Sequence, residues 1–206
     1  MKLDVVLQEQ NSRGQLLLRS FFGFLYILIP HAFCLFFLSI WSVILTFIAW
    51  WAILFTGRYP RSFFDYQVKL YRWNLRLTAR MFHMVDDYPA IGLNAQDSKT
   101  VLEVPYPESY SRMQLILISL FGWLMVIPHA FCLFFLAIGA LFVNFIAWWA
   151  VLITGKYPIG LHGYMVKFLR WAYRVNLYFS VMSHSYPKFN GQQEPAVAIA
   201  DQFRNS

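Results

Sequence analysis

Two histidines in apolar surroundings are the residues of this sequence best suited to chemistry. His31 and His129 each follow a proline, Pro30 and Pro128, inside a long apolar run. Ionisable groups in an apolar layer are costly and often mark function, and two facing imidazoles can hold haem iron or another metal. A proline also frees a backbone carbonyl one turn earlier, which an imidazole can satisfy. This structural interpretation is favoured because no carboxylate accompanies either histidine, while a lipid headgroup or quinone contact stays open.

Both histidines belong to a stretch that occurs twice. Residues 30–37 and 128–135 have identical sequences, and the Thr-Gly-Arg/Lys-Tyr-Pro stretch at 56–60 returns at 154–158. The second copy is one residue shorter just before its proline, between Gly122 and Pro128. Two copies are too few for a stacked array, so the sequence predicts a tandem duplication. Its expected parts are repeat 1 (1–90), a linker (91–100), repeat 2 (101–190) and a polar tail (191–206).

The composition is typical of a membrane protein. Hydrophobic residues make up 59% of the chain and charged residues 13%, against about 25% charged in soluble domains. Charged residues are absent from 20–57 and from 113–155, and each run has room for two spans of roughly 20 residues. We therefore expect one transmembrane helical hairpin per repeat, at 15–57 and 113–155. The rival is one span per repeat, with each proline ending a re-entrant stub.

Basic residues flank both apolar runs, and basic loops stay in the cytoplasm. This pattern predicts a multi-pass protein of the bacterial inner membrane with both termini cytoplasmic. The two repeats would then be parallel and related by an axis along the membrane normal. Each hairpin should be followed by a basic amphipathic helix in the interface, at 61–82 and 159–182. Short segments near residues 3–7 and 100–104 are expected to pair as strands. The predicted fold class is all-α.

Basic side chains recur at helical spacing in both amphipathic segments. Two further basic residues lie in the Thr-Gly-Arg/Lys-Tyr-Pro turns, where glycine and proline indicate a helix end. The functional interpretation is binding of anionic lipid or of an acidic partner, and the alternative is a solvated face that fixes orientation. The candidate residues are Arg58, Lys69, Arg72, Arg76, Lys156, Lys167, Arg170 and Arg174.

Three features together resemble a bacterial membrane family, the domain-of-unknown-function family numbered 4389. They are the Ile-Pro-His triplets that begin at Ile29 and Ile127, the Ala-Trp-Trp-Ala run with its Thr-Gly-Arg/Lys-Tyr-Pro turn, and Arg-Trp followed by a terminal Tyr-Pro. The features cover nearly all of both repeats. The resemblance implies a fold and a bacterial membrane location, and it implies no activity.

Motifs for catalysis are absent from the sequence: it has no nucleophile elbow, phosphate-binding glycine loop, zinc spacing or paired catalytic carboxylates. Cys34 and Cys132 occupy equivalent apolar positions, as expected of small buried hydrophobes. We expect no enzyme, no metal and no nucleic-acid partner. The leading hypothesis is an accessory or scaffold subunit that docks a membrane-protein partner or forms a homo-oligomer. The alternatives are a lipid-binding or lipid-transport protein and a haem or quinone redox subunit.

Overall fold

The computed structural model describes residues 1–183 and 185–193, so the expected polar tail lies outside the described residues from 194 onward. Helices dominate this part of the chain, and one small strand pair accompanies them, as the sequence predicts. In chain order the elements are β1 (Lys2–Val5), α1 (Arg13–Gly23), η1 (Phe24–Leu28), α2 (Ile29–Thr56), α3 (Arg61–Met81), β2 (Thr100–Glu103), α4 (Arg112–Thr154) and α5 (Ile159–Phe179).

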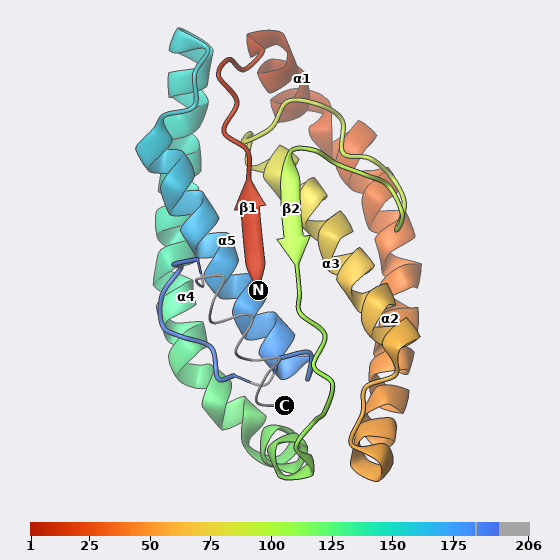
Figure 1. Ribbon diagram of the computed structural model, residues 1–206. Coiled ribbons are helices and arrows are strands. Elements are labelled where there is room, and N and C mark those ends of the chain that lie inside the picture. Colours follow the sequence, from red (N-terminus) through yellow and green to blue (C-terminus); the bar gives the residue numbers. More distant parts are fainter. Residues whose placement is uncertain (184, 194–206) are drawn as a thin grey trace.

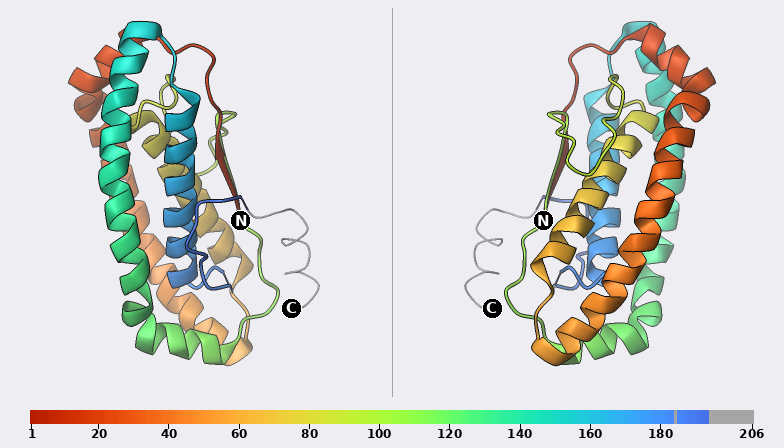
Figure 2. Two further views of the ribbon diagram at one scale, coloured as in Figure 1. Left: turned by 90° about the vertical axis from the view of Figure 1, so that its left-hand side faces the viewer. Right: turned by 90° about the vertical axis from the view of Figure 1, so that its right-hand side faces the viewer.

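Each apolar run forms one long helix, which corrects the expectation of a hairpin within each run. Arg13–Thr56 is continuous over 44 residues and Arg112–Thr154 over 43, which gives each a length of about 65 Å along its axis. The first turns of each long helix bend across the molecule (Figures 1 and 2). Ser42, near the middle of the first apolar run, lies inside the helix, where the Thr46 hydroxyl donates to the Ser42 carbonyl at 2.9 Å. The runs contain no pair of turn-forming residues, so nothing breaks the helix there.

The prolines do not end these helices either, which corrects the rival expectation of re-entrant stubs. Pro128 lies inside α4, and Pro30 follows a single π-helical segment, η1, at Phe24–Leu28. A π-helical turn accommodates one extra residue in an α-helix. Repeat 1 is one residue longer than repeat 2 just before its proline. The π-helix therefore absorbs the length difference and keeps the two long helices in register.

The long helices end at glycines, as the sequence predicts. Gly57 and Gly155 adopt the left-handed conformation, with φ of 70° and 73°. The Gly57 N–H donates to the Ile53 carbonyl, and the Gly155 N–H donates to the Val151 carbonyl. The proline three residues later then opens α3 or α5, which folds back along its own long helix. Each repeat is therefore a hairpin made of one long and one shorter helix.

The two repeats run in opposite directions, whereas the basic residues that flank both apolar runs predicted parallel repeats. The start of each long helix contacts the end of the other: Arg13 Nη2 donates to the Ile153 carbonyl at 2.8 Å, and Arg112 Nη2 donates to the Phe55 carbonyl at 3.0 Å. Figure 1 shows α2 descending on the right of the molecule and α4 ascending on the left. The contacts at the two ends are equivalent, so a pseudo-two-fold axis crosses the middle of the molecule.

The expected strand pair is confirmed and joins the repeats. β1 and β2 are antiparallel, with Lys2 opposite Glu103 and Leu3 opposite Leu102. We call this pair the ribbon. The side views show three layers: the long helices, then α3 and α5, then the ribbon (Figure 2). Leu3 and Leu102 are buried against the middle layer, in a core that both repeats share. The ribbon exists only because each repeat contributes one strand.

Candidate functional site

The two histidines occupy equivalent enclosed sites, one in each repeat. His31 and His129 are both fully buried. Nδ1 of His31 accepts a hydrogen bond from the Trp73 indole at 2.7 Å, and Nδ1 of His129 accepts one from the Trp171 indole at 3.1 Å. Each imidazole is thus tied to the shorter helix of its own repeat.

Aromatic rings cover both imidazoles. The Tyr88 ring centroid lies 5.5 Å from that of His31, and the Tyr186 ring centroid lies 5.0 Å from that of His129. Phe189 also stacks on His129, with centroids 4.0 Å apart. The terminal Tyr-Pro of each repeat is therefore a cover over its histidine. Within the described residues, no group of three or more His, Cys, Asp or Glu is arranged to hold a metal ion. The contacts favour the structural interpretation of these histidines.

The basic stripe predicted on the shorter helices faces the ribbon and the loops. Arg72 Nε donates to the Leu102 carbonyl at 2.8 Å, and Arg170 Nε donates to the Leu3 carbonyl at 2.7 Å. Each arginine thereby holds a strand that begins the other repeat. Arg170 also pairs with Asp4, with an N–O distance of 3.3 Å. These two guanidinium groups fasten the ribbon to the middle layer.

The next arginine along each stripe is buried beneath a loop. Arg76 donates from Nη1 to the Ala95 carbonyl at 2.9 Å and from Nη2 to the Gly92 carbonyl at 2.6 Å. Arg174 donates in the same way to the carbonyls of Asn190 and Gln192. Loop backbone therefore occupies these two guanidinium groups. A free amphipathic helix in the headgroup plane does not describe α3 or α5, since both are packed between two layers.

The remaining predicted residues reach the surface. Lys167 is exposed and Lys69 is half-buried, both on the shorter helices beside the ribbon. Arg58 and Lys156 are exposed at the glycine caps of the two long helices. The antiparallel arrangement places these caps at opposite ends of the molecule. The structure therefore distributes the basic side chains and does not gather them into one site.

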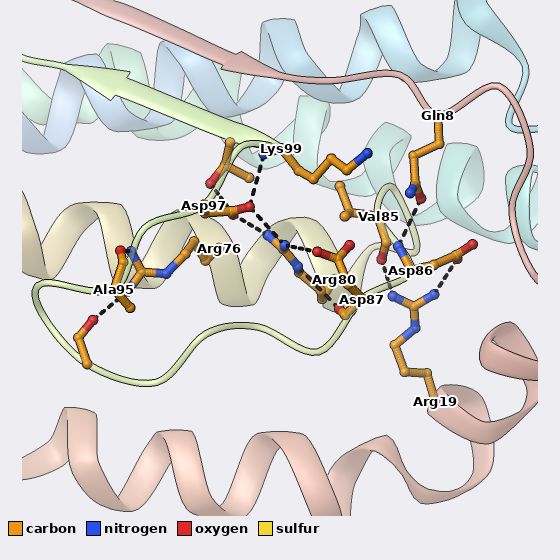
Figure 3. Close-up of polar contacts among 12 residues, drawn as sticks. Gln8, Arg19, Arg76, Arg80, Val85, Asp86, Asp87, Ala95, Asp97 and Lys99 are labelled. Atoms are coloured by element: carbon orange, nitrogen blue, oxygen red, sulfur yellow. Dashed lines mark hydrogen bonds and ion pairs between the residues drawn. The ribbon is translucent and has the colours of Figure 1, made fainter.

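An ionic cluster around three buried arginines in repeat 1 was not predicted from the sequence. Its members are Arg19, Arg76, Arg80, Asp86, Asp87 and Asp97 (Figure 3). Arg80 is 1% exposed and donates to both Asp97 oxygens, at 2.5 and 3.1 Å. Arg19 pairs with Asp86 at 2.9 Å and donates to the Val85 carbonyl. The sequence signal is that repeat 2 lacks these charges, with Ile118, Tyr178 and Ser185 in place of Arg19, Arg80 and Asp87.

This cluster secures the segment that joins the repeats. Burial on its own would raise the pKa of Asp97, but hydrogen bonds from Arg80, Thr100 and the Lys99 backbone outweigh it and lower that pKa below the ordinary value. The carboxylate stays ionised and holds the linker against α3. All six side chains serve internal contacts, so the arrangement suits a structural fastening better than catalysis.

Exposed apolar side chains gather on the long helices. Phe21, Phe33, Val43, Phe47 and Phe55 in repeat 1 are all more than 60% exposed. The most apolar windows of the two long helices are only 17% and 11% buried, so these are not core helices of the ordinary soluble kind. Both helices are long and apolar enough to cross a membrane. We call this layer the apolar face; it lies opposite the ribbon (Figure 2).

A model of the family described as "Domain of unknown function (DUF4389)" matches residues 17–91 and 119–190. The two matched segments correspond to the two repeats. No curated protein and no solved structure matches the chain.

Proposed function

The chain belongs to the DUF4389 family, a domain of unknown function, and we propose that it is a non-enzymatic accessory protein that lies flat in one leaflet of a membrane. The observation that carries this proposal is the separation of its two faces. Large exposed apolar side chains cover the long helices, while exposed charges such as Lys2 and Glu103 lie on the ribbon. An apolar surface of this extent marks a membrane or protein interface.

Length argues for a flat orientation. α2 alone, with 28 residues, is about 42 Å long and so exceeds the roughly 30 Å hydrocarbon thickness of a bilayer, and α1 continues beyond it. The ribbon lies level with the middle of the long helices, across the layer of α3 and α5 (Figures 1 and 2), and its Lys2, Asp4 and Glu103 side chains are 50% to 61% exposed. If the long helices crossed the bilayer upright, these charges would lie at mid-depth, at a cost of about 2.5–3.5 kcal/mol each. Lying flat places them in water.

In the flat orientation, the basic residues at both ends of the long helices lie at the same depth in the membrane. Arg58 and Arg112 lie at one end of the paired long helices, and Arg13 and Lys156 lie at the other. All four are exposed at helix ends, where they reach the headgroups and attract anionic lipids. The pseudo-two-fold axis then lies along the membrane normal. Following the charge rule, the ribbon side faces the cytoplasm of a bacterial inner membrane.

Two properties of the protein support the accessory role: its candidate functional side chains make structural contacts, and its apolar face is exposed. The candidate histidines and buried arginines are engaged in structural contacts, and a large exposed apolar face is typical of a protein interface as well as of a membrane contact. We expect that face to dock a membrane-protein partner or a second copy of the chain within the leaflet. Purification in mild detergent should yield a defined complex; a monodisperse monomer with no co-purifying protein would count against this role.

Cysteine accessibility tests the orientation. In a Cys34→Ala/Cys132→Ala background, Arg58→Cys and Lys156→Cys should both react with a membrane-impermeant maleimide in inverted vesicles and neither in intact spheroplasts. An upright orientation would place these two positions on opposite sides, because they lie at opposite ends of the molecule.

Two further positions serve as controls. Lys167→Cys should behave like the two end positions, since Lys167 is exposed one turn before Arg170, whose Nε donates to the Leu3 carbonyl of the ribbon. Phe37→Cys, which is 55% exposed on the apolar face, should resist the reagent in vesicles and react in detergent. If Phe37→Cys is readily labelled in vesicles, the apolar face is not buried in the membrane, and the proposed orientation is wrong.

A further inference from the structure

A cleft of about 530 Å³ lies between the repeats and opens at the apolar face. Its mouth includes Val43 and Phe47, which are 69% and 64% exposed on α2. Its inner wall comes from α3, and Phe179 and Ser180 at the end of α5 close one side. The volume is within the range of small-molecule sites. If the apolar face is seated in a membrane, as proposed above, the cleft opens to lipid.

The inner wall of this cleft is polar and carries no charge. Gln67 is 4% exposed; its amide donates to Thr46 Oγ1 at 2.9 Å and accepts from the Ser42 hydroxyl at 2.6 Å. Tyr71 and Ser180 share a hydrogen bond of 2.9 Å across the two repeats. Among residues 1–183 and 185–193, no Asp, Glu, Lys, Arg or His lines the cleft. A charged headgroup would therefore be desolvated here without a partner, whereas hydroxyls and carbonyls find donors and acceptors.

The duplication provides an internal comparison. The positions in repeat 2 equivalent to Ser42, Gln67, Tyr71 and Asn74 are Ala140, Met165, Leu169 and Ala172. Only Thr46 has a polar counterpart, Asn144. Because repeat 2 builds the same helix pair with apolar residues, the fold does not require the polar wall. Polar groups in an apolar layer are costly, and in repeat 1 they line a cavity that a ligand can enter.

We infer that this cleft binds a neutral glycerolipid with a free hydroxyl, of the diacylglycerol type. Both Gln67 N–H groups and the Ser42 hydroxyl proton are used within the protein, so Gln67 Oε1 and Ser42 Oγ accept from the lipid hydroxyl. An ester carbonyl accepts from the Asn74 N–H that is not bonded to the Leu70 carbonyl. The acyl chains leave between Val43 and Phe47 into the surrounding lipid. The chemistry of the lining selects against phospholipids, whose phosphate lacks a cation in the cleft. The inference rests on the membrane seat proposed above.

Photolabelling tests the inference. The probe is a diacylglycerol that carries a diazirine in one acyl chain, used in phosphatidylcholine vesicles with the full chain. Label should map to peptides containing residues 42–50 or 67–74, and excess unlabelled diacylglycerol should suppress it. A phosphatidylglycerol with the same diazirine chain should label these peptides at least tenfold less. Equal labelling by both probes, or label that excess diacylglycerol leaves unchanged, would overturn the inference.

Matched variants of the two repeats sharpen the test. Ser42→Ala/Gln67→Met gives repeat 1 the residues of repeat 2, and the loss of two hydrogen bonds should reduce labelling about tenfold. Val43→Trp should block the mouth without a folding penalty, because Val43 is exposed. The equivalent change in repeat 2, Leu141→Trp, should leave labelling unchanged. Loss of label in Leu141→Trp as well, or retention in Val43→Trp, would contradict the assigned site.

Vesicle flotation separates this inference from the proposed function. If the protein floats with vesicles but fails the labelling test, the proposed membrane location stands and the proposed lipid site is refuted. If the protein does not float, the proposed membrane location is refuted, and labelling of the same variants in mixed detergent micelles tests the lipid site.

Discussion

The Trp73 indole donates a 2.7 Å hydrogen bond to Nδ1 of His31, and this contact joins the long helix of repeat 1 to α3. The same contact in repeat 2, between Trp171 and His129, is 3.1 Å. A contact retained in both copies, each in fully buried surroundings, explains why a histidine follows each proline: it fastens the two helices of a repeat together.

Removing the indole donor should destabilise the protein. Trp73→Phe leaves a buried imidazole nitrogen without its donor, at an expected cost of about 1–3 kcal/mol. Thermal unfolding followed by circular dichroism in detergent measures the loss. Trp171→Phe should cost a similar amount, whereas Trp51→Phe, on the exposed apolar face, should change little. Equal stability of Trp73→Phe and the native protein would mean that the hydrogen bond contributes nothing.

The ion pair between Arg80 and Asp97 should be a strong fastening of the linker. The two side chains are 1% and 6% exposed. Asp97→Asn leaves Arg80 with only the half-exposed Asp87 as a charged partner, and breaking a buried pair costs about 3 kcal/mol or more. We expect a lower midpoint of denaturation and faster proteolysis near residues 91–99. Unchanged proteolysis in Asp97→Asn would show that other contacts hold the linker.

His83 should make stability depend on pH. It lies outside the long helices, and burial, then the Arg19 charge, lower its pKa from 6.5 to about 4. Between pH 6.5 and about pH 4, His83 is protonated in the unfolded chain and neutral in the folded chain. Stability from this group is thus complete above pH 6.5 and falls by up to about 3 kcal/mol as the pH drops to 4.

The variant His83→Asn isolates that effect. Asparagine accepts the left-handed backbone at this position, where φ is 56°, and it does not titrate. Between pH 6.5 and 4 its unfolding free energy should decline less than that of the native protein. Asp97 does not interfere, because its lowered pKa shifts its own contribution to more acidic solutions. If the unfolding free energies of the native protein and His83→Asn fall equally with pH, His83 does not cause the pH dependence.

Disulfide trapping checks the antiparallel ribbon. Lys2 and Glu103 are paired positions whose side chains meet at 3.3 Å. In the background without native cysteines, Lys2→Cys/Glu103→Cys should form a disulfide within one chain, since paired strand residues have a suitable Cα separation. The mismatched pair Lys2→Cys/Thr100→Cys should stay reduced. Gel mobility before and after reduction distinguishes them, and oxidation of the mismatched pair alone would exclude this register.

Much of the local structure could be predicted from the sequence. The duplication, the glycine caps at Gly57 and Gly155, and the strand pair are all present as expected, because each depends on neighbouring residues or on internal identity. The helical spacing of Arg72 and Arg76 was also predicted correctly. What covers that stripe was not predictable, since loop residues such as Ala95 contact it only after the chain folds back.

By itself the sequence determined an apolar, duplicated, mainly helical chain with basic residues outside its two long runs, because composition and short-range spacing fix these properties. Only the tertiary structure decided that each run is one unbroken helix and that the repeats oppose each other. The physical reason is that the apolar runs carry no turn signal. The direction of the second repeat depends on distant pairs, such as Arg13 with the Ile153 carbonyl and Lys2 with Glu103. Those pairs gather the charges on the ribbon side and leave the aromatic side chains of the long helices on the other.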